Sequence, residues 1–370
     1  MKRIVLLIKS NAVTFIAFLL AVITAFIVPP DRGYLAYFDF KTLTCLFTVL
    51  AVVCALRNVR FFYTLAEKIV KKFGNLRLAV LALVYITFIG SMLIANDMAL
   101  ITFLPLGYFV LLTADKKQYM CVTFILQNIA ANLGGMLTPF GNPQNLYLYS
   151  KFNIPDGEFM LIMLPCFLLA VAMITAACFI FIKPEPLEFR GTERRLPPVR
   201  IAIYLALFAL AIICVFKVIP YQISLIVIPA VIIIMDRDAL AKVDYGLLLT
   251  FVFFFIFAGN MARIEPVRQL FSTLLEKSTL VVSALCCQVI SNVPTAILLS
   301  QFTDNYKELL LGVNIGGCGT LISSLASLIT FREYAEHNPG KSGKYLLVFS
   351  AFNFTFLAVM LGFSLVLLSL

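Results

Sequence analysis

The segment NLGGMLTPFGNPQNL, which runs from Asn132 to Leu146, decides how this chain folds. It places three glycines, two prolines and three asparagines within 15 residues, whereas the sequence on either side is mostly apolar. One continuous helix over Tyr119–Ser150 would be about 48 Å long, which exceeds the roughly 30 Å of a bilayer's hydrocarbon core. Because each proline inside a helix costs about 3 kcal/mol, we predict two half-helices with an unwound segment between them.

The composition indicates an integral membrane protein with many spans. The chain has 370 residues, of which 62% are hydrophobic and 13% charged, and its mean hydropathy is +0.99. Ala12–Val28, Glu158–Ile182 and Tyr345–Leu370 are nearly free of charge and long enough to cross the lipid bilayer. The N-terminal MKRIVLLIKS and the apolar run behind it lack a small-residue cleavage site before Pro29. We therefore interpret them as part of the first transmembrane helix rather than as a signal peptide.

Residue types and their positions disfavour several function classes. All nine cysteines lie in apolar segments without CxxC spacing or a nearby histidine, which is typical of small core residues rather than of metal sites or disulfides. The net charge of +10 comes from lysines and arginines in short loops, so it sets membrane orientation and does not indicate a nucleic-acid partner. The apolar segments show no nucleophile–base pair and no metal cluster, so we expect neither an enzyme nor a bound cofactor.

The basic residues predict the orientation of the chain. We assign 21 of the 29 lysines and arginines to loops on one face, including Lys2, Arg3 and Lys9 at the N-terminus and the segment Arg332–Lys344. By the positive-inside rule that face is cytoplasmic, and we expect the chain in the plasma or inner membrane with its N-terminus inside. We expect no lysine or arginine at mid-depth.

That assignment holds only if Leu76–Leu112 returns to the side that it entered, because both of its flanks are basic. Asn96–Asp97 breaks the apolar stretch at its middle. Two full spans would place this pair in an outer loop, whereas a re-entrant hairpin would place it near mid-depth against an enclosed cavity.

The second half of the chain repeats the first. NIGGCGTLISSLASL, at Asn314–Leu328, carries the same residues at the same spacing as the opening segment. The matched pairs are Asn132 and Asn314, Gly134 and Gly316, Gly135 and Gly317, and Thr138 and Thr320. Upstream, IANDMALITFLP matches ISNVPTAILLSQF, with Asn96 aligned to Asn292, and the amphipathic RFFYTLAEKIVKKF matches RIEPVRQLFSTLLEK. Three elements in the same order indicate a duplicated unit.

The repeat predicts the architecture. We expect a first unit at 1–182, a linker and connecting helix at 183–218, and a second unit at 219–370. Each unit would contain two spans, an interfacial helix, a broken apolar pair, a glycine-rich broken span and a final span. The fold would be all-α, with about nine transmembrane helices plus two re-entrant hairpins, two unwound helices and an inverted second unit. Secondary transporters commonly have this arrangement.

The polar breaks predict a binding site. The backbone N–H and C=O groups of an unwound segment in a membrane need partners, which a bound substrate or ion can supply. The alternative is that the glycines serve only close helix packing and the prolines only kink the helix, but this would not explain the asparagines. Asp97 could cap the helix that follows it, carry a proton or bind a cation. Its counterpart is Val293, so we expect the two halves to differ chemically. The candidate ligands are Asn96, Asp97, Asn132, Thr138, Gly141, Asn142, Asn145, Ser291, Asn292, Thr295, Asn314, Thr320, Ser323 and Ser324, with a possible Na⁺ near Asn96, Asp97, Gly141 and Asn292.

The four motifs together resemble those of the ion transporter superfamily, which includes divalent anion–sodium symporters, citrate transporters, arsenite permeases and some Na⁺/H⁺ antiporters. The resemblance implies hairpins that enter from opposite faces with Asn96 and Asn292 at their tips. It also implies unwound spans around Thr138–Asn145 and Thr320–Ser324 that enclose substrate and cations. Members are typically homodimers that move a transport domain past a scaffold, as an elevator. The tips here lack the complete Ser-Asn-Thr signature of dicarboxylate symporters and look closer to arsenite permeases.

These observations predict a secondary active transporter of a small anion, either a carboxylate or an inorganic oxyanion, coupled to Na⁺ or H⁺. An arsenite-type permease, or a Na⁺/H⁺ antiporter in which Asp97 binds both ions in turn, is the alternative within transport. A channel would not need two inverted broken units, and it ranks below both.

Overall fold

The computed structural model describes residues 12–187 and 196–369, which form helices joined by short loops. The only β-type pairing within these ranges is an isolated bridge between Asn75 and Pro186. Lys2, Arg3 and Lys9, on which the predicted cytoplasmic N-terminus partly depends, lie outside the described residues.

The helices occur in the predicted order in both halves of the chain. The first half contains α2 (Ala12–Ile27), η1 (Arg32–Tyr37), α3 (Phe40–Asn58), α4 (Phe61–Val70), α5 (Leu76–Ile94), α6 (Asn96–Thr113), η2 (Lys117–Tyr119), α7 (Met120–Gly134), η3 (Gly135–Leu137), α8 (Pro143–Lys151) and α9 (Asp156–Phe181). The connecting helix is α10 (Pro198–Val215). The second half contains α11 (Tyr221–Met235), α12 (Arg237–Ala241), α13 (Tyr245–Ala262), α14 (Glu265–Lys277), α15 (Thr279–Ile290), α16 (Asn292–Leu299), α17 (Tyr306–Ile315), α18 (Leu325–His337) and α19 (Ser342–Ser369).

This arrangement confirms the predicted all-α polytopic membrane fold. Eight described helices are long and apolar enough to cross a membrane, and these include both arms of the first hairpin, α5 and α6. Without the two hairpin arms, six of these helices remain. The shorter α2 and α11 and the broken pair α17–α18 add three crossings, which gives nine among the described residues. The amphipathic α4 and α14 are also present, as predicted.

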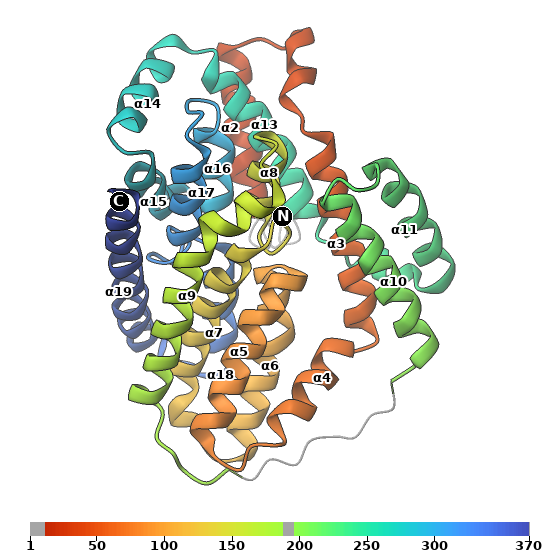
Figure 1. Cartoon of the computed structure of the whole chain (residues 1–370), viewed down its shortest axis with the longest axis vertical. Helices are drawn as coiled ribbons and strands as arrows, with labels where there is room; N and C mark the ends of the chain where they lie inside the picture. Colours follow the sequence, from red (N-terminus) through yellow and green to blue (C-terminus); the bar gives the residue numbers. More distant parts are fainter. Residues whose placement is uncertain (1–11, 188–195, 370) are drawn as a thin grey trace.

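The two halves run in opposite directions. Figure 1 shows the hairpin α5–α6 in the lower half of the molecule and the hairpin α15–α16 in the upper half, with their tips directed toward the centre. The broken span α7–α8 rises through the molecule, whereas its counterpart α17–α18 descends. The tips also share one backbone conformation, since Ala95 has φ 67° and ψ 152° and Ser291 has φ 73° and ψ 159°. Non-glycine residues rarely adopt a positive φ, so finding it at both matched tips supports the inverted repeat and the re-entrant hairpin.

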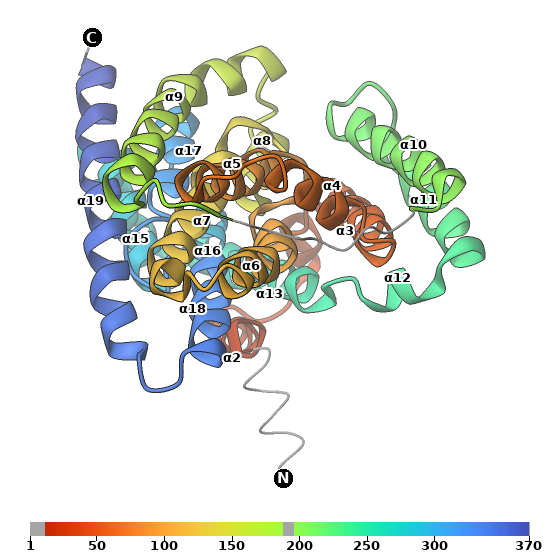
Figure 2. The same cartoon turned by 90° about the horizontal axis from the view of Figure 1, so that it is seen from below.

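A separate group of helices packs around the hairpins. The N-terminal span α2 packs closely along α13, where the Thr14 hydroxyl donates to the Gly246 carbonyl (3.0 Å) and Asn260 Nδ2 donates to the Thr24 hydroxyl (3.3 Å). The matched pair α3 and α11 packs in the same way. Seen from below, α10 to α12 lie at one edge of the molecule and α19 at the opposite edge (Figure 2).

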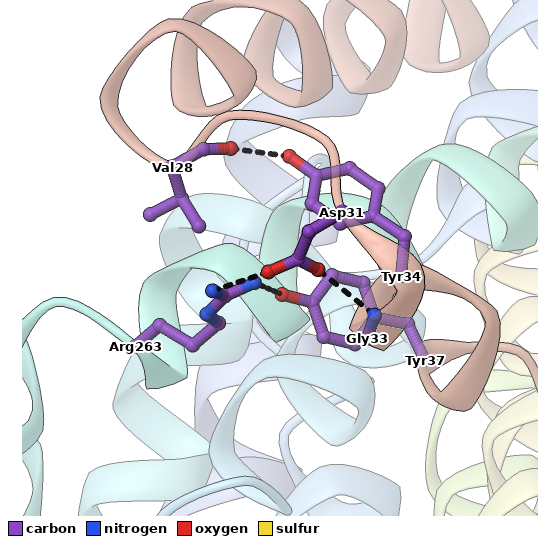
Figure 3. Close-up of polar contacts among 6 residues, drawn as sticks. All are labelled: Val28, Asp31, Gly33, Tyr34, Tyr37 and Arg263. Carbon is purple, nitrogen blue, oxygen red and sulfur yellow. Dashed lines mark hydrogen bonds and ion pairs between the residues drawn. The ribbon is translucent and has the colours of Figure 1, made fainter.

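Polar contacts join the two halves at both ends of these paired helices. At one end, Arg263 donates to Asp31 (2.7 Å) and to the Tyr37 hydroxyl (3.2 Å), as Figure 3 shows. At the other end, Asn58 Nδ2 donates to Asp236 (3.1 Å). Each contact joins the loop after the first span of one half to the end of the second span of the other, as an inverted repeat requires.

Candidate functional site

The first broken span is held open by Asn145. Helix α7 ends at Gly134, the turn η3 ends at Leu137, and α8 begins at Pro143. Asn145 lies in the first turn of α8, and its Nδ2 donates to the carbonyls of Gly135 (3.1 Å), Met136 (3.2 Å) and Thr138 (3.3 Å). One side chain therefore satisfies three carbonyls that the break leaves without helical partners. The unwound segment consequently stops at Asn142 and is shorter than the predicted Thr138–Asn145.

The second broken span uses a different residue for the same purpose. The chain is non-helical from Gly316 to Ser324, which is longer than the predicted Thr320–Ser324. Gln288, from the hairpin arm α15, donates to the carbonyls of Gly316 (3.0 Å) and Cys318 (3.1 Å) and accepts from the Thr320 backbone N–H (2.9 Å). The sequence analysis missed Gln288, because Ser327 is the residue aligned with Asn145.

The hairpins dock on the broken spans through matched hydroxyl contacts. The Thr138 hydroxyl donates to the Met92 carbonyl (2.8 Å), and the Thr320 hydroxyl donates to the Gln288 carbonyl (2.9 Å). Met92 and Gln288 each lie four residues before the tip asparagine of their hairpin. The two predicted threonines thus have equivalent positions, and each fixes a hairpin tip to its own break.

The predicted asparagines converge between the two halves. Asn132 Oδ1 accepts from Asn96 Nδ2 (3.1 Å) and from the Ser324 hydroxyl (2.9 Å). Asn314 Oδ1 accepts from Asn142 Nδ2 (3.2 Å), and Asn314 Nδ2 donates to Asn145 Oδ1 (2.6 Å). Every one of these side chains is buried. The structure therefore brings six predicted site residues into one amide-rich centre that joins the repeats.

Other predicted residues use their polar groups locally. The Thr295 hydroxyl donates to the Ser291 carbonyl (2.7 Å), and the Ser323 hydroxyl donates to the carbonyls of Gly317 (2.9 Å) and Thr320 (2.8 Å). A Cβ at Gly141 would lie 2.4 Å from the Gly135 carbonyl oxygen, so this glycine permits a close approach of two backbone segments. These positions shape the breaks.

Several buried polar atoms at the centre have no hydrogen-bond partner among the described residues. They are Asn132 Nδ2, Asn142 Oδ1, Gln144 Oε1 and Asp97 Oδ1. Buried polar groups are almost always paired, and an unpaired one costs about 1–3 kcal/mol. The centre therefore holds one unpaired donor and three unpaired acceptors, and two of these residues, Asp97 and Gln144, also line a cavity.

Asp97 lies in the first turn of α6 and is half-buried. The backbone N–H of Asp97 donates to Asn96 Oδ1 (3.0 Å), and the matched Val293 N–H donates to Asn292 Oδ1 (2.9 Å). The tip asparagines therefore accept the first-turn N–H groups. The Asp97 carboxylate is not needed to cap α6, which was one of the roles that the sequence allowed for it.

A cavity of about 400 Å³ adjoins this centre. Its lining includes both hairpin tips, the start of α8, and parts of α2, α13 and α18. Of the predicted residues, five line it: Asn96, Asp97, Ser291, Asn292 and Ser324. The structure adds Gln144, Asp244 and Arg332, which the sequence analysis did not select.

Arg332 corrects the sequence prediction. The sequence analysis assigned it to a loop, but it lies within α18 and lines the cavity. In the sequence, an apolar run ends just before Arg332 and polar residues follow it up to His337. A span that ends in a loop has the same pattern, so the sequence alone did not show that the helix continues.

The amino-acid sequence is similar to those of known transporters over most of its length. A family model described as citrate transporter matches residues 4–306. An uncharacterised transporter of Methanocaldococcus jannaschii is 32% identical over 326 residues, which cover 84% of this chain and 85% of that protein. An inner membrane protein of Escherichia coli is 26% identical over 83% of this chain and 84% of its own length. A silicon efflux transporter of Oryza sativa is 28% identical over 41% of this chain and 31% of its own length.

The family match covers most of the chain, including both hairpins and the first broken span. The matched residues include four of the six that form the amide-rich centre: Asn96, Asn132, Asn142 and Asn145. The chain therefore belongs to the citrate transporter family and is a multi-pass secondary transporter.

Proposed function

We propose that this protein transports a small anion, a carboxylate or an inorganic oxyanion, by coupling its movement to Na⁺ or H⁺. The observation that carries the proposal is the set of unpaired polar atoms where the two hairpins and the two broken spans meet, beside the cavity that Asp97 lines.

Four helix N-termini at this centre favour an anion. Helices α6, α8, α16 and α18 begin there, at Asn96, Pro143, Asn292 and Leu325. The N-terminus of a helix carries a partial positive charge and unpaired N–H groups, and both attract anions. The unpaired Asn132 Nδ2 adds a side-chain donor. Anion binding near the centre would thus need no lysine or arginine there.

The unpaired oxygens favour a coupled cation. Asp97 Oδ1, Asn142 Oδ1 and Gln144 Oε1 are acceptors of the kind that Na⁺ takes, and the Asp97 carboxylate can alternatively hold a proton. Broken helices that place carbonyl groups near such a site are a common feature of ion-coupled transporters. The predicted Na⁺ position near Gly141 and Asn292 remains part of this proposal.

We further propose an elevator movement in a homodimer of the plasma or inner membrane, with the N-terminus in the cytoplasm. The hairpins and broken spans are linked by hydrogen bonds, whereas α2 packs along α13 and α3 packs along α11, and each of these pairs has a polar contact at one end. Such a division suits a moving body and a fixed scaffold.

The test is uptake by the purified protein in proteoliposomes. Labelled citrate, malate, phosphate and arsenate are each offered with an imposed Na⁺ or pH gradient. We expect one gradient to drive accumulation of at least one of these solutes. Accumulation of none of them, together with Na⁺/H⁺ exchange across the same vesicles, would replace the anion proposal by the antiporter alternative.

The role of Asp97 is tested in the same vesicles. Asp97→Asn keeps the shape of the side chain but removes its charge, so we expect uptake to lose its dependence on the driving ion. The matched control is Asp238→Asn, an exposed carboxylate on α12 outside the cavity lining. Unchanged ion dependence in Asp97→Asn would show that Asp97 does not carry the coupling.

A further inference from the structure

Arg332 occupies an unusual position for an arginine in a membrane protein. Helix α18 begins at the centre with Leu325, and Leu325, Leu328 and Arg332 line the cavity along one face of it. Seven residues of α-helix rise about 10 Å, so Arg332 lies about 10 Å along α18 from the centre. Charged side chains that line a cavity of a membrane protein commonly mark a substrate or ion pathway.

The Arg332 guanidinium is available to a ligand. It is exposed to the cavity and forms no hydrogen bond or ion pair with any residue of the described ranges. The acidic residue next to it, Glu333, is engaged by His337 one turn further along α18 (3.3 Å). Asp97 and Asp244 line the same cavity, but neither lies within ion-pair distance of Arg332.

The cavity between Arg332 and the centre suits a ligand with charge at one end and an apolar body. Its walls include Leu20, Phe254, Phe257 and Leu298, which offer no hydrogen bonds from their side chains. The N-termini of α16 and α18 at the centre also favour an anion, whereas the Asp97 and Asp244 carboxylates on the same lining favour a cation.

We propose that Arg332 binds an anionic group of the transported substrate in this cavity and thereby selects anions over neutral solutes. The guanidinium is permanently charged and can bind a carboxylate or oxyanion through two parallel hydrogen bonds. The proposal rests on the proposed function, since it assigns a specificity-determining residue to the same transport reaction.

The test is the KM for whichever anion of the uptake panel the wild-type protein transports. Arg332→Gln is expected to raise KM about 10- to 100-fold, the range for one lost hydrogen bond to a charged group. Arg332→Lys keeps the charge but not the paired geometry, so its KM should lie between the two. Arg200→Gln on α10, an exposed arginine outside the cavity lining, is the matched control and should leave KM unchanged.

A charge-rescue experiment separates recognition from a packing role. Arg332→Cys protein is folded and reconstituted first, then treated with a methanethiosulfonate reagent that carries either an ammonium or a sulfonate group, with treated wild-type protein as the reference for the nine native cysteines. We expect the ammonium reagent to lower KM and the sulfonate reagent to raise it.

The outcomes distinguish this inference from the proposed function. If the wild-type protein takes up an anion and Arg332→Gln has the wild-type KM, or if both reagents act alike, the assignment of Arg332 is wrong while anion transport stands. If the wild-type protein takes up no anion, the proposed function itself fails.

Discussion

The amide bridge between the two halves makes a quantitative prediction at Asn314. This side chain is 1% exposed and forms three hydrogen bonds: one to its own helix at Leu310, and one each to Asn142 and Asn145 in the other half. Asn314→Ala removes all three. Asn142 Nδ2 keeps the Asn132 carbonyl as a second acceptor (3.3 Å), but Asn145 Oδ1 loses its partner while remaining buried.

A matched control allows the contribution of the bridge to be isolated. Asn353 on α19 is also fully buried and also donates to the carbonyl four residues earlier, at Phe349 (3.0 Å), but its Oδ1 has no partner. Asn353→Ala therefore removes the same atoms and the same local hydrogen bond without breaking a bridge.

The expected difference follows from the two cross-half bonds. Leaving Asn145 Oδ1 buried and unpaired costs about 1–3 kcal/mol, and losing the bond to Asn142 costs about 1 kcal/mol more. We expect Asn314→Ala to lower the free energy of unfolding by about 2–4 kcal/mol more than Asn353→Ala does. Denaturant titration in one detergent measures both variants. An equal effect of the two substitutions would refute the claim that the asparagine bridge holds the repeats together.

Two further predictions concern close packing and a loop ion pair. A Cβ at Gly134 would lie 2.3 Å from the Phe88 carbonyl oxygen on the hairpin arm, so Gly134→Ala should shift the hairpin tip and reduce uptake. Nothing lies within 4 Å of a Cβ at Gly362, so the control Gly362→Ala should stabilise α19 by about 1 kcal/mol. Equal melting temperatures and equal uptake in the two variants would contradict this prediction. The Arg263 guanidinium holds the pKa of Asp31 below its usual 3.8, so the ion pair stabilises the fold above pH 3.8 and its contribution is lost as the pH falls through the lowered pKa. Asp31→Asn should therefore lower the melting temperature at pH 7 but not at the acidic end of a pH series, and a pH-independent difference would contradict the assignment.

The elements that the sequence predicted correctly are those with local physical signals. Clustered glycine, proline and asparagine residues weaken an apolar helix, so the breaks near Gly134 and Gly316 could be located from residue type alone. The repeat then identified both hairpin tips, because Asn96 and Asn292 align, and the structure gives Ala95 and Ser291 the same positive φ. Here the sequence pattern and the backbone requirement agree at each position.

The elements that the sequence missed depend on tertiary contacts. Gln288 lies on an ordinary helix, and only the docking of α15 against the second break brings its amide to the free carbonyls. Arg332 was misplaced because the positive-inside rule treats a basic residue after an apolar run as a loop residue, although α18 continues to His337. Asp244 caps α13 through the Leu247 N–H (2.9 Å), and its position beside the cavity follows from the packing of α13 against α2 and α16.

The chemical difference between the halves constrains the coupling. Both hairpin tips have the same backbone geometry, and both present a helix N-terminus to the centre, so the features that attract an anion are duplicated. The carboxylate is not duplicated, because Val293 stands where the first tip has Asp97, and Ser324 stands where the first break has Asn142. Two equivalent cation sites related by the repeat would need equivalent ligands. Under the proposed function, we therefore expect a single coupled ion, held by the first half near Asp97, and an anion shared between the two halves.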